Sequence, residues 1–342
     1  MIVIYILGYI VLGLISIYLI LLIMGLYLLK KGPLPFDEKA LENDGGKYAE
    51  TEDGRKVEYF VFGNLEPQSK VVICIHGHGP EAMSEIAFNE KCCIELGLKG
   101  IAISLPGYGY TDMKPGRQVA DWPKEDLAAV LKKEEVDKFM IMGHSQGTVH
   151  AMAAAYYYPE RCEGFGLNAP LLPSKVSKEV GVVSAIGSDS LPNTSTIQKF
   201  YMAWYFGVMH LSLVTLSPWL PLKAIKMAST TATFRIMRDT LKRAVIRGIV
   251  GGTYETTDDV CYDWGFDPRN IKNDNICIWH ASDDELCPPE IGKWLSDYYQ
   301  KELGVKVNFR ADKLGYGHFT YKQGEFLKPD QSMIKALLEG RN

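Results

Sequence analysis

Short apolar runs alternate with amphipathic stretches over most of the chain. The apolar runs cover residues 71–75, 101–105, 139–142, 164–167, 276–279 and 305–309. Stretches with helical periodicity lie between them, at residues 84–96, 124–133, 146–158 and 289–301. Strands that are apolar throughout and alternate with helices are typical of a parallel sheet that is covered on both faces. The pattern therefore predicts a doubly wound, mostly parallel α/β domain.

The alternation is modified in two places. Residues 48–62 form two β-rich stretches around Asp53-Gly54, a strong turn signal, so we expect the domain to begin with antiparallel strands. Later, about 90 residues separate the strand at 164–167 from the strand at 276–279, whereas ordinary connections have about 2 to 6 residues. We interpret residues 171–262 as an inserted helical cap.

The first 29 residues contain no charged side chain, and crossing a bilayer takes about 20 helical residues. This segment predicts a transmembrane helix over residues 1–29. A cleaved signal peptide is the alternative, but no basic segment precedes the run and no small-residue cleavage site follows it. Lys30 and Lys31 follow the run, so the positive-inside rule places the rest of the chain in the cytosol. Residues 30–46, with their Pro and Gly, predict a linker to a domain at 47–342.

Composition and charge exclude several classes of function. The net charge of −4 gives no basic field for nucleic acid, so no nucleic-acid partner is expected. The seven cysteines are scattered without C-x-x-C spacing, which favours reduced core thiols over disulfides or a zinc site. The chain has no G-x-G-x-x-G, Walker loop or H-E-x-x-H motif. We therefore expect no cofactor.

Residues 143–147, Gly-His-Ser-Gln-Gly, stand between a predicted strand and a predicted helix. This is the context of a nucleophile elbow, whose tight turn leaves the serine hydroxyl exposed above the sheet. Gly143 and Gly147 would supply the close backbone approach, and Ser145 would be the nucleophile. The alternative is an ordinary strand-to-helix turn that happens to contain a serine.

A serine nucleophile needs a base and an acid that orients the base. Asp284 follows the strand at 276–279, and His318 follows the strand at 305–309. The carboxyl ends of parallel strands share one edge of a sheet, and the chain order Ser, Asp, His is the order that such sheets use. Taken alone, Asp284 would be interpreted as a solvated turn residue, and His318 as an ordinary surface or core residue. Jointly, Ser145, Asp284 and His318 predict a catalytic triad, with Asp283 and Glu285 as neighbouring candidates for the acid.

These motifs resemble those of the α/β-hydrolase superfamily over residues 47–342. The family's acid motif, G-x-x-D-x-x-x-P, matches residues 281–288 with Ala281 in place of the glycine, and the match selects Asp284. The resemblance implies an α/β-hydrolase fold.

A second stretch, His76-Gly77-His78-Gly79-Pro80, is similar to the family's oxyanion loop. The resemblance implies that the backbone N–H groups of His78 and Gln146 face the developing oxyanion. A metal site built from His76 and His78 is the competing interpretation, but no acidic or cysteine ligand lies nearby in sequence, and no metal is predicted.

Residues 200–222 contain no Asp, Glu, Lys or Arg. A membrane crossing there would separate Ser145 from Asp284 and His318, so we interpret this run as a lid over the site or a segment lying in the membrane interface. Basic residues follow it, namely Lys223, Lys226, Arg235, Arg238, Lys242, Arg243 and Arg247, against one acidic residue, Asp239. An apolar and then basic surface suits an anionic membrane, whereas the alternative is a cap whose basic side faces water.

The sequence thus predicts a membrane-anchored serine hydrolase of carboxylic esters, similar to monoacylglycerol lipases and esterases. Its expected partners are a small-molecule or lipid ester and membrane lipid. One alternative is an amide or peptide hydrolase, because Gly79-Pro80 resembles the oxyanion loop of proline iminopeptidases. A non-catalytic binding protein on the same fold is another.

Overall fold

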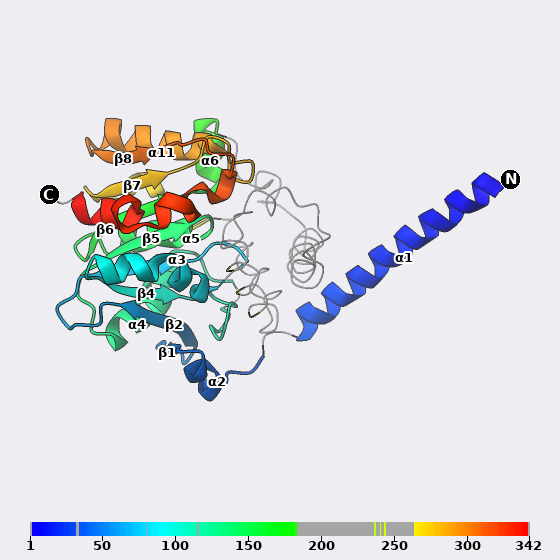
Figure 1. Ribbon diagram of the computed structural model, residues 1–342, viewed down its shortest axis with the longest axis horizontal. Helices are drawn as coiled ribbons and strands as arrows, with labels where there is room; N and C mark the ends of the chain where they lie inside the picture. The colour runs from blue at the N-terminus through cyan, green and yellow to red at the C-terminus, as the bar shows by residue number, and fades with distance from the viewer. Residues whose placement is uncertain are drawn as a thin grey trace.

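An eight-stranded sheet forms the centre of the computed structural model, which describes residues 2–31, 34–79, 81–114, 116–182, 236, 240, 243 and 263–340. The strand order is β1-β2-β4-β3-β5-β6-β7-β8 (Figure 1). The strands are β1 (Lys47–Glu50), β2 (Lys56–Gly63), β3 (Val71–Ile75), β4 (Lys99–Ile103), β5 (Phe139–His144), β6 (Cys162–Asn168), β7 (Ile276–Trp279) and β8 (Val307–Arg310). β1 and β2 pair antiparallel to each other and β2 to β4, while the remaining pairs are parallel. The predicted mostly parallel sheet is confirmed.

The central strands are apolar because both of their faces are covered. In β3, Val71, Ile73 and Ile75 pack into one hydrophobic core, and Val72 and Cys74 pack into the other. All five side chains are buried, which explains why the strand is a continuous apolar run instead of an alternating one.

Helices cover both faces of the sheet. On one face lie α4 (Ala128–Lys133), α5 (Gly147–Tyr157), α6 (Ser174–Val180) and α11 (Pro289–Glu302), and on the other lie α3 (Ala82–Glu95) and α12 (Met333–Glu339). The helices predicted at 84–96, 146–158 and 289–301 match α3, α5 and α11 within a few residues. The helix predicted at 124–133 is divided into a π-helical turn, η1 (Pro123–Leu127), and α4. Short 3₁₀ segments complete the fold, namely η3 (Pro268–Asn270), η4 (Gly317–Lys322), η5 (Gly324–Leu327) and η6 (Pro329–Gln331).

The first two strands form the predicted antiparallel pair, but their turn is longer than two residues. Glu50 faces Lys56, so residues 51–55 form the connection. Gly54 there has φ +82°, in the left-handed region that glycine adopts without strain. Within the segment predicted as a linker, residues 38–43 form the short helix α2 (Glu38–Asn43), whose N-terminus is capped by the Asp37 carboxylate.

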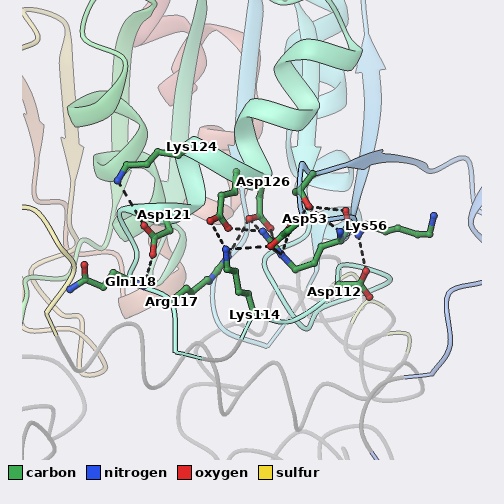
Figure 2. Close-up of polar contacts among 12 residues, drawn as sticks. Asp53, Lys56, Asp112, Lys114, Arg117, Gln118, Asp121, Lys124 and Asp126 are labelled. Atoms are coloured by element: carbon green, nitrogen blue, oxygen red, sulfur yellow. Dashed lines mark hydrogen bonds and ion pairs between the residues drawn. The ribbon is translucent and has the colours of Figure 1, made fainter.

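A network of ion pairs joins the connection between β1 and β2, residues 51–55, to η1 (Figure 2). The buried carboxylate of Asp126 accepts hydrogen bonds from Arg55, at 3.2 Å, and from Arg117, at 3.3 Å. Lys114 pairs with Glu125 at 2.5 Å and with Asp53 at 3.3 Å. Burial raises the pKa of Asp126, because it disfavours the charged carboxylate. The guanidinium groups of Arg55 and Arg117 oppose this effect and stabilise the charged form.

The predicted transmembrane helix over residues 1–29 is wrong. Residues 2–31 do form a helix, α1 (Ile2–Lys31), which extends away from the sheet (Figure 1). A crossing requires about 20 consecutive apolar helical residues. Among the residues that the structure describes, none of the helices combines the necessary length with the necessary apolarity. The same finding overturns the predicted single-pass anchor, and the cytosolic placement that was derived from it loses its basis.

Most of the predicted cap, residues 171–262, lies outside the described residues, as does the whole apolar run at 200–222. One described residue from it, Arg243, contacts the sheet domain. Its guanidinium binds Glu58 at 3.1 Å and Asp44 at 3.0 Å, and it also pairs with Glu81. The side chains of Glu58 and Glu81 are fully buried, so Arg243 neutralises charge in the interior.

Candidate active site

Ser145 occupies a sharp turn directly between β5 and α5. Its φ is +52°, a conformation that side chains other than glycine rarely adopt and that costs about 1 to 3 kcal/mol. The Ser145 N–H donates to Asn168 O at 2.8 Å, and the Ser145 carbonyl accepts from Thr148 N at 3.0 Å. The surrounding backbone therefore holds the serine in a strained geometry, while its side chain stays half-buried.

The flanking glycines allow the backbones around this turn to approach closely. A Cβ at Gly143 would lie 2.2 Å from Gly147 O, and a Cβ at Gly147 would lie 2.4 Å from Ile75 O. Both contacts are with backbone atoms that cannot move aside. The turn thus requires glycine at both positions, as the elbow motif predicts.

The loop after β3 lies against Ser145. A Cβ at Gly77 would lie 3.2 Å from Ser145 Cβ, so the loop backbone passes directly beside the serine. The loop is held by His76, whose Nε2 accepts from Leu105 N at 2.9 Å. His78 and Gln146 are the residues predicted to supply the oxyanion N–H groups, and their side chains are neighbours: burial lowers the pKa of His78 to about 4, and the Gln146 side chain opposes that shift only in part. The structure therefore brings both of them to the same turn.

Asp284 and His318 form a buried hydrogen-bonded pair. His318 Nδ1 lies 2.8 Å from Asp284 Oδ2, and the exposed fraction of each residue is 6%. The other oxygen of Asp284, Oδ1, accepts from Leu286 N at 2.8 Å and from Cys287 N at 3.0 Å. His280 Nε2 lies a further 3.3 Å from Oδ2. The carboxylate is thus fixed by four contacts and orients the His318 ring.

The pKa of Asp284 is lowered and the pKa of His318 is raised. Burial opposes the charge of Asp284, but His318 and the hydrogen bonds from His280 and the Cys287 N–H outweigh it and hold the pKa of the carboxyl well below its usual range. Burial also opposes a charged imidazole, but the Cys287 sulfur and the Asp284 carboxylate beside the ring raise the pKa of His318 to about 10. The imidazolium form of His318 is therefore strongly stabilised.

A second histidine, His144, lies beside His318. The ring centroids are 4.8 Å apart, which places His318 next to the residue that precedes Ser145. Burial, together with the neighbouring His318, lowers the pKa of His144 well below its ordinary value. His144 is therefore neutral and adds no second positive charge to the site.

The segment that carries His318 is anchored by a buried ion pair. Lys322, at the end of η4, donates to both carboxylate oxygens of Glu85 on α3, at 2.8 and 2.7 Å. The exposed fractions of the two side chains are 4% and 3%. Asn89 Nδ2 also donates to Glu85, at 3.0 Å. This pair fixes η4 against α3.

Replacing Lys322 with methionine is expected to lower the free energy of unfolding by about 3 to 5 kcal/mol, because Glu85 would stay buried without its cation. Urea denaturation measures the change. Lys293→Met, which removes the exposed pair with Asp297, is the matched control and should cost no more than about 1 kcal/mol. The double variant Glu85→Leu with Lys322→Met should recover most of the loss, and equal effects of the two single lysine variants would contradict this role of the buried pair.

Comparison with known proteins concerns the fold that carries this site. The model of the alpha/beta hydrolase fold family matches residues 70–211. An esterase from Rhodococcus has a TM-score of 0.58 at 18% identity, covering 86% of this chain and 99% of its own. The chain has the α/β-hydrolase fold. Further solved structures of similar shape include a meta-cleavage product hydrolase from Pseudomonas fluorescens, with a TM-score of 0.59 at 17% identity, covering 88% of this chain and 100% of its own.

A curated relative is a 2-hydroxy-6-oxononadienedioate/2-hydroxy-6-oxononatrienedioate hydrolase from Pseudomonas putida. It is 26% identical over 124 residues. The match covers 35% of this chain and 43% of that relative, so it spans less than half of either chain. These similarities establish the fold, and the similar proteins include both an esterase and hydrolases of other named substrates.

The structure brings Asp284 and His318 together and places Ser145, His78 and Gln146 at the adjoining turn. Their catalytic roles stay predictions. Sequence reasoning assigned no role to His280 or Cys287, both of which contact this pair. Both residues stand within or next to the acid motif, at the end of β7 and three positions after Asp284. A signal was therefore present, but only the fold of the loop shows that these side chains turn inward.

Proposed function

We propose that this protein is a serine hydrolase that cleaves carboxylic esters, with Ser145 as nucleophile, His318 as base and Asp284 as the orienting acid. The observation that carries the proposal is the strained Ser145 turn, which lies beside His144 and hence beside the hydrogen-bonded Asp284–His318 pair. A serine hydroxyl and a carboxylate-oriented imidazole are the groups that acyl transfer to serine requires.

In the proposed reaction, Ser145 Oγ attacks the ester carbonyl and His318 Nε2 accepts the hydroxyl proton. His318 then delivers that proton to the departing alcohol, which leaves an acyl-serine. Water attacks the acyl carbon with His318 again as base, and the carboxylic acid and the free serine are released. Asp284 stabilises the imidazolium in both steps and stays ionised because four groups donate to it or lie against it. The backbone N–H groups of His78 and Gln146 would bind the oxyanion.

The pH dependence follows from the raised pKa of His318. Only the unprotonated imidazole accepts a proton, so kcat/KM should fall as the pH is lowered, with the acid limb above the ordinary histidine value of about 6.5. Stopped-assay pH profiles of ester hydrolysis, corrected with an enzyme-free blank, measure this limb. Cys287→Ala should move it to lower pH, because the Cys287 sulfur is one cause of the shift. An acid limb at or below pH 6.5 would contradict the assignment.

A substrate panel tests the reaction class. It should contain short p-nitrophenyl esters, monoacylglycerols, an aminoacyl-proline amide and a 2-hydroxy-6-oxo-dienedioate of the kind named for the bacterial relative. Turnover of one or more esters, absent from the Ser145→Ala variant, supports the proposal. Turnover of the amide alone would favour a peptidase of the proline iminopeptidase type, and turnover of the dienedioate alone would favour the activity of the relative. Binding of an ester without turnover would indicate a non-catalytic protein on this fold.

A further inference from the structure

Three potential metal ligands of different chemistry meet at one buried point. One ligand atom each from Asp284, Cys287 and His318 all lie within 4.8 Å of one another. All three residues are buried, with exposed fractions of 6%, 1% and 6%. The Cys287 sulfur therefore lies beside the His318 ring. Among the described residues, this is the one group of three that could hold a metal ion.

The donor set fits zinc better than other common divalent cations. Zinc binds thiolate sulfur, imidazole nitrogen and carboxylate oxygen, with three protein ligands and a water where the site is open. Magnesium and calcium prefer sets made only of oxygen. A buried sulfur and nitrogen next to one carboxylate therefore favour a soft or borderline ion.

Binding zinc requires the His318–Asp284 contact to open. Zinc–ligand distances of about 2.0 to 2.3 Å place tetrahedral ligand atoms roughly 3.3 to 3.7 Å apart. His318 Nδ1 and Asp284 Oδ2 are now 2.8 Å apart, so zinc cannot lie between them while their hydrogen bond persists. A metal bound instead through Nε2 would occupy the nitrogen that accepts the serine proton.

We propose that Asp284, Cys287 and His318 form an inhibitory zinc site. Zinc binding there competes with the catalytic hydrogen bond between Asp284 and His318. Zinc displaces the protons of the Cys287 thiol and the His318 imidazole and holds the side chains in a tetrahedral set completed by water. The inhibition rests on the proposed serine-hydrolase function, whereas the binding of zinc does not.

Titration calorimetry with Zn²⁺ alone separates these two claims. The experiment uses the full chain carrying Ser145→Ala, which lacks the proposed nucleophile but keeps all three ligands. We expect one Zn²⁺ per chain and at least a tenfold loss of affinity when Cys287→Ala is added. Cys277→Ala is the matched control, because Cys277 is equally buried on β7 but lies outside the cluster. The same comparison with Mg²⁺ should give no binding in any variant.

Activity assays complete the test with the protein that retains Ser145. Zinc should inhibit ester hydrolysis, a chelator should restore it, and Cys287→Ala should raise the inhibitory zinc concentration at least tenfold while Cys277→Ala does not. Unchanged calorimetric affinity on adding Cys287→Ala overturns the zinc site. If the protein binds zinc tightly, with a loss of affinity in Cys287→Ala, but hydrolyses no ester, the zinc site is supported and the proposed function is overturned.

Discussion

Replacing Ser145 with alanine is expected to reduce kcat for ester hydrolysis by about 10⁴- to 10⁶-fold, with KM changed little. The variant removes the atom that would attack the carbonyl and leaves the oxyanion donors in place, so a small residual rate above water should remain. Kinetics with the best ester of the panel measure the loss. Covalent labelling by a fluorophosphonate probe, followed by mass spectrometry of the labelled peptide, should identify Ser145 and disappear in the variant.

A loss of activity through unfolding is separated from a loss of chemistry by a second substitution. Ser145 has φ +52°, a conformation that glycine adopts without strain. Ser145→Gly should therefore be as inactive as Ser145→Ala, yet have a free energy of unfolding equal to that of the parent or up to about 1 kcal/mol higher. Persistent labelling of either variant at another serine would show that the nucleophile is assigned to the wrong residue.

Replacing Asp284 with asparagine is expected to reduce kcat by about 10⁴-fold, because it reverses the direction of one hydrogen bond. The asparagine oxygen can still accept from the Leu286 and Cys287 N–H groups, which directs its NH₂ group toward His318 Nδ1. Nδ1 must then accept, so the proton of the neutral ring moves to Nε2. That nitrogen can no longer take the proton of Ser145.

Asp283→Asn is the control for this prediction. Asp283 is adjacent in sequence, but its carboxylate accepts from Gly315 N at 2.8 Å. The Asp283→Asn substitution should therefore change kcat by less than about tenfold. The acid limb of the pH profile should also move down in Asp284→Asn, because one of the charges that raises the pKa of His318 is gone. A larger loss from Asp283→Asn than from Asp284→Asn would transfer the acid role to Asp283.

The core of the fold could be predicted because hydrophobic periodicity reports burial directly. The runs at 71–75 and 276–279 coincide with β3 and β7, since every position in them is buried and the local pattern suffices. The helix α12 was not predicted, although Ile334 and Leu337 are fully buried on the sheet. At seven residues, its apolar pattern is too short to distinguish from a loop.

The candidate site was predictable where a motif fixes local geometry and unpredictable where side chains from distant segments meet. The spacing of Ser145 and its glycines encodes a turn, which the structure contains. The contact of Lys322 with Glu85 spans 237 positions, and nothing near either residue reveals its partner. The N-terminal segment shows the opposite failure. The absence of charged side chains over residues 1–29 predicted a membrane-spanning helix, and the structure contradicts that prediction.

Arg243 limits how freely this protein could be recombined with its relatives. The Arg243 guanidinium, which comes from the predicted cap, pairs with Glu58 and Glu81, and Ser104 Oγ also donates to Glu58, at 2.7 Å. A chimera that brings in a foreign cap without an equivalent cation would leave these two buried carboxylates without the Arg243 guanidinium. Domain grafting on this scaffold must therefore transfer residues on both sides of the boundary as one unit.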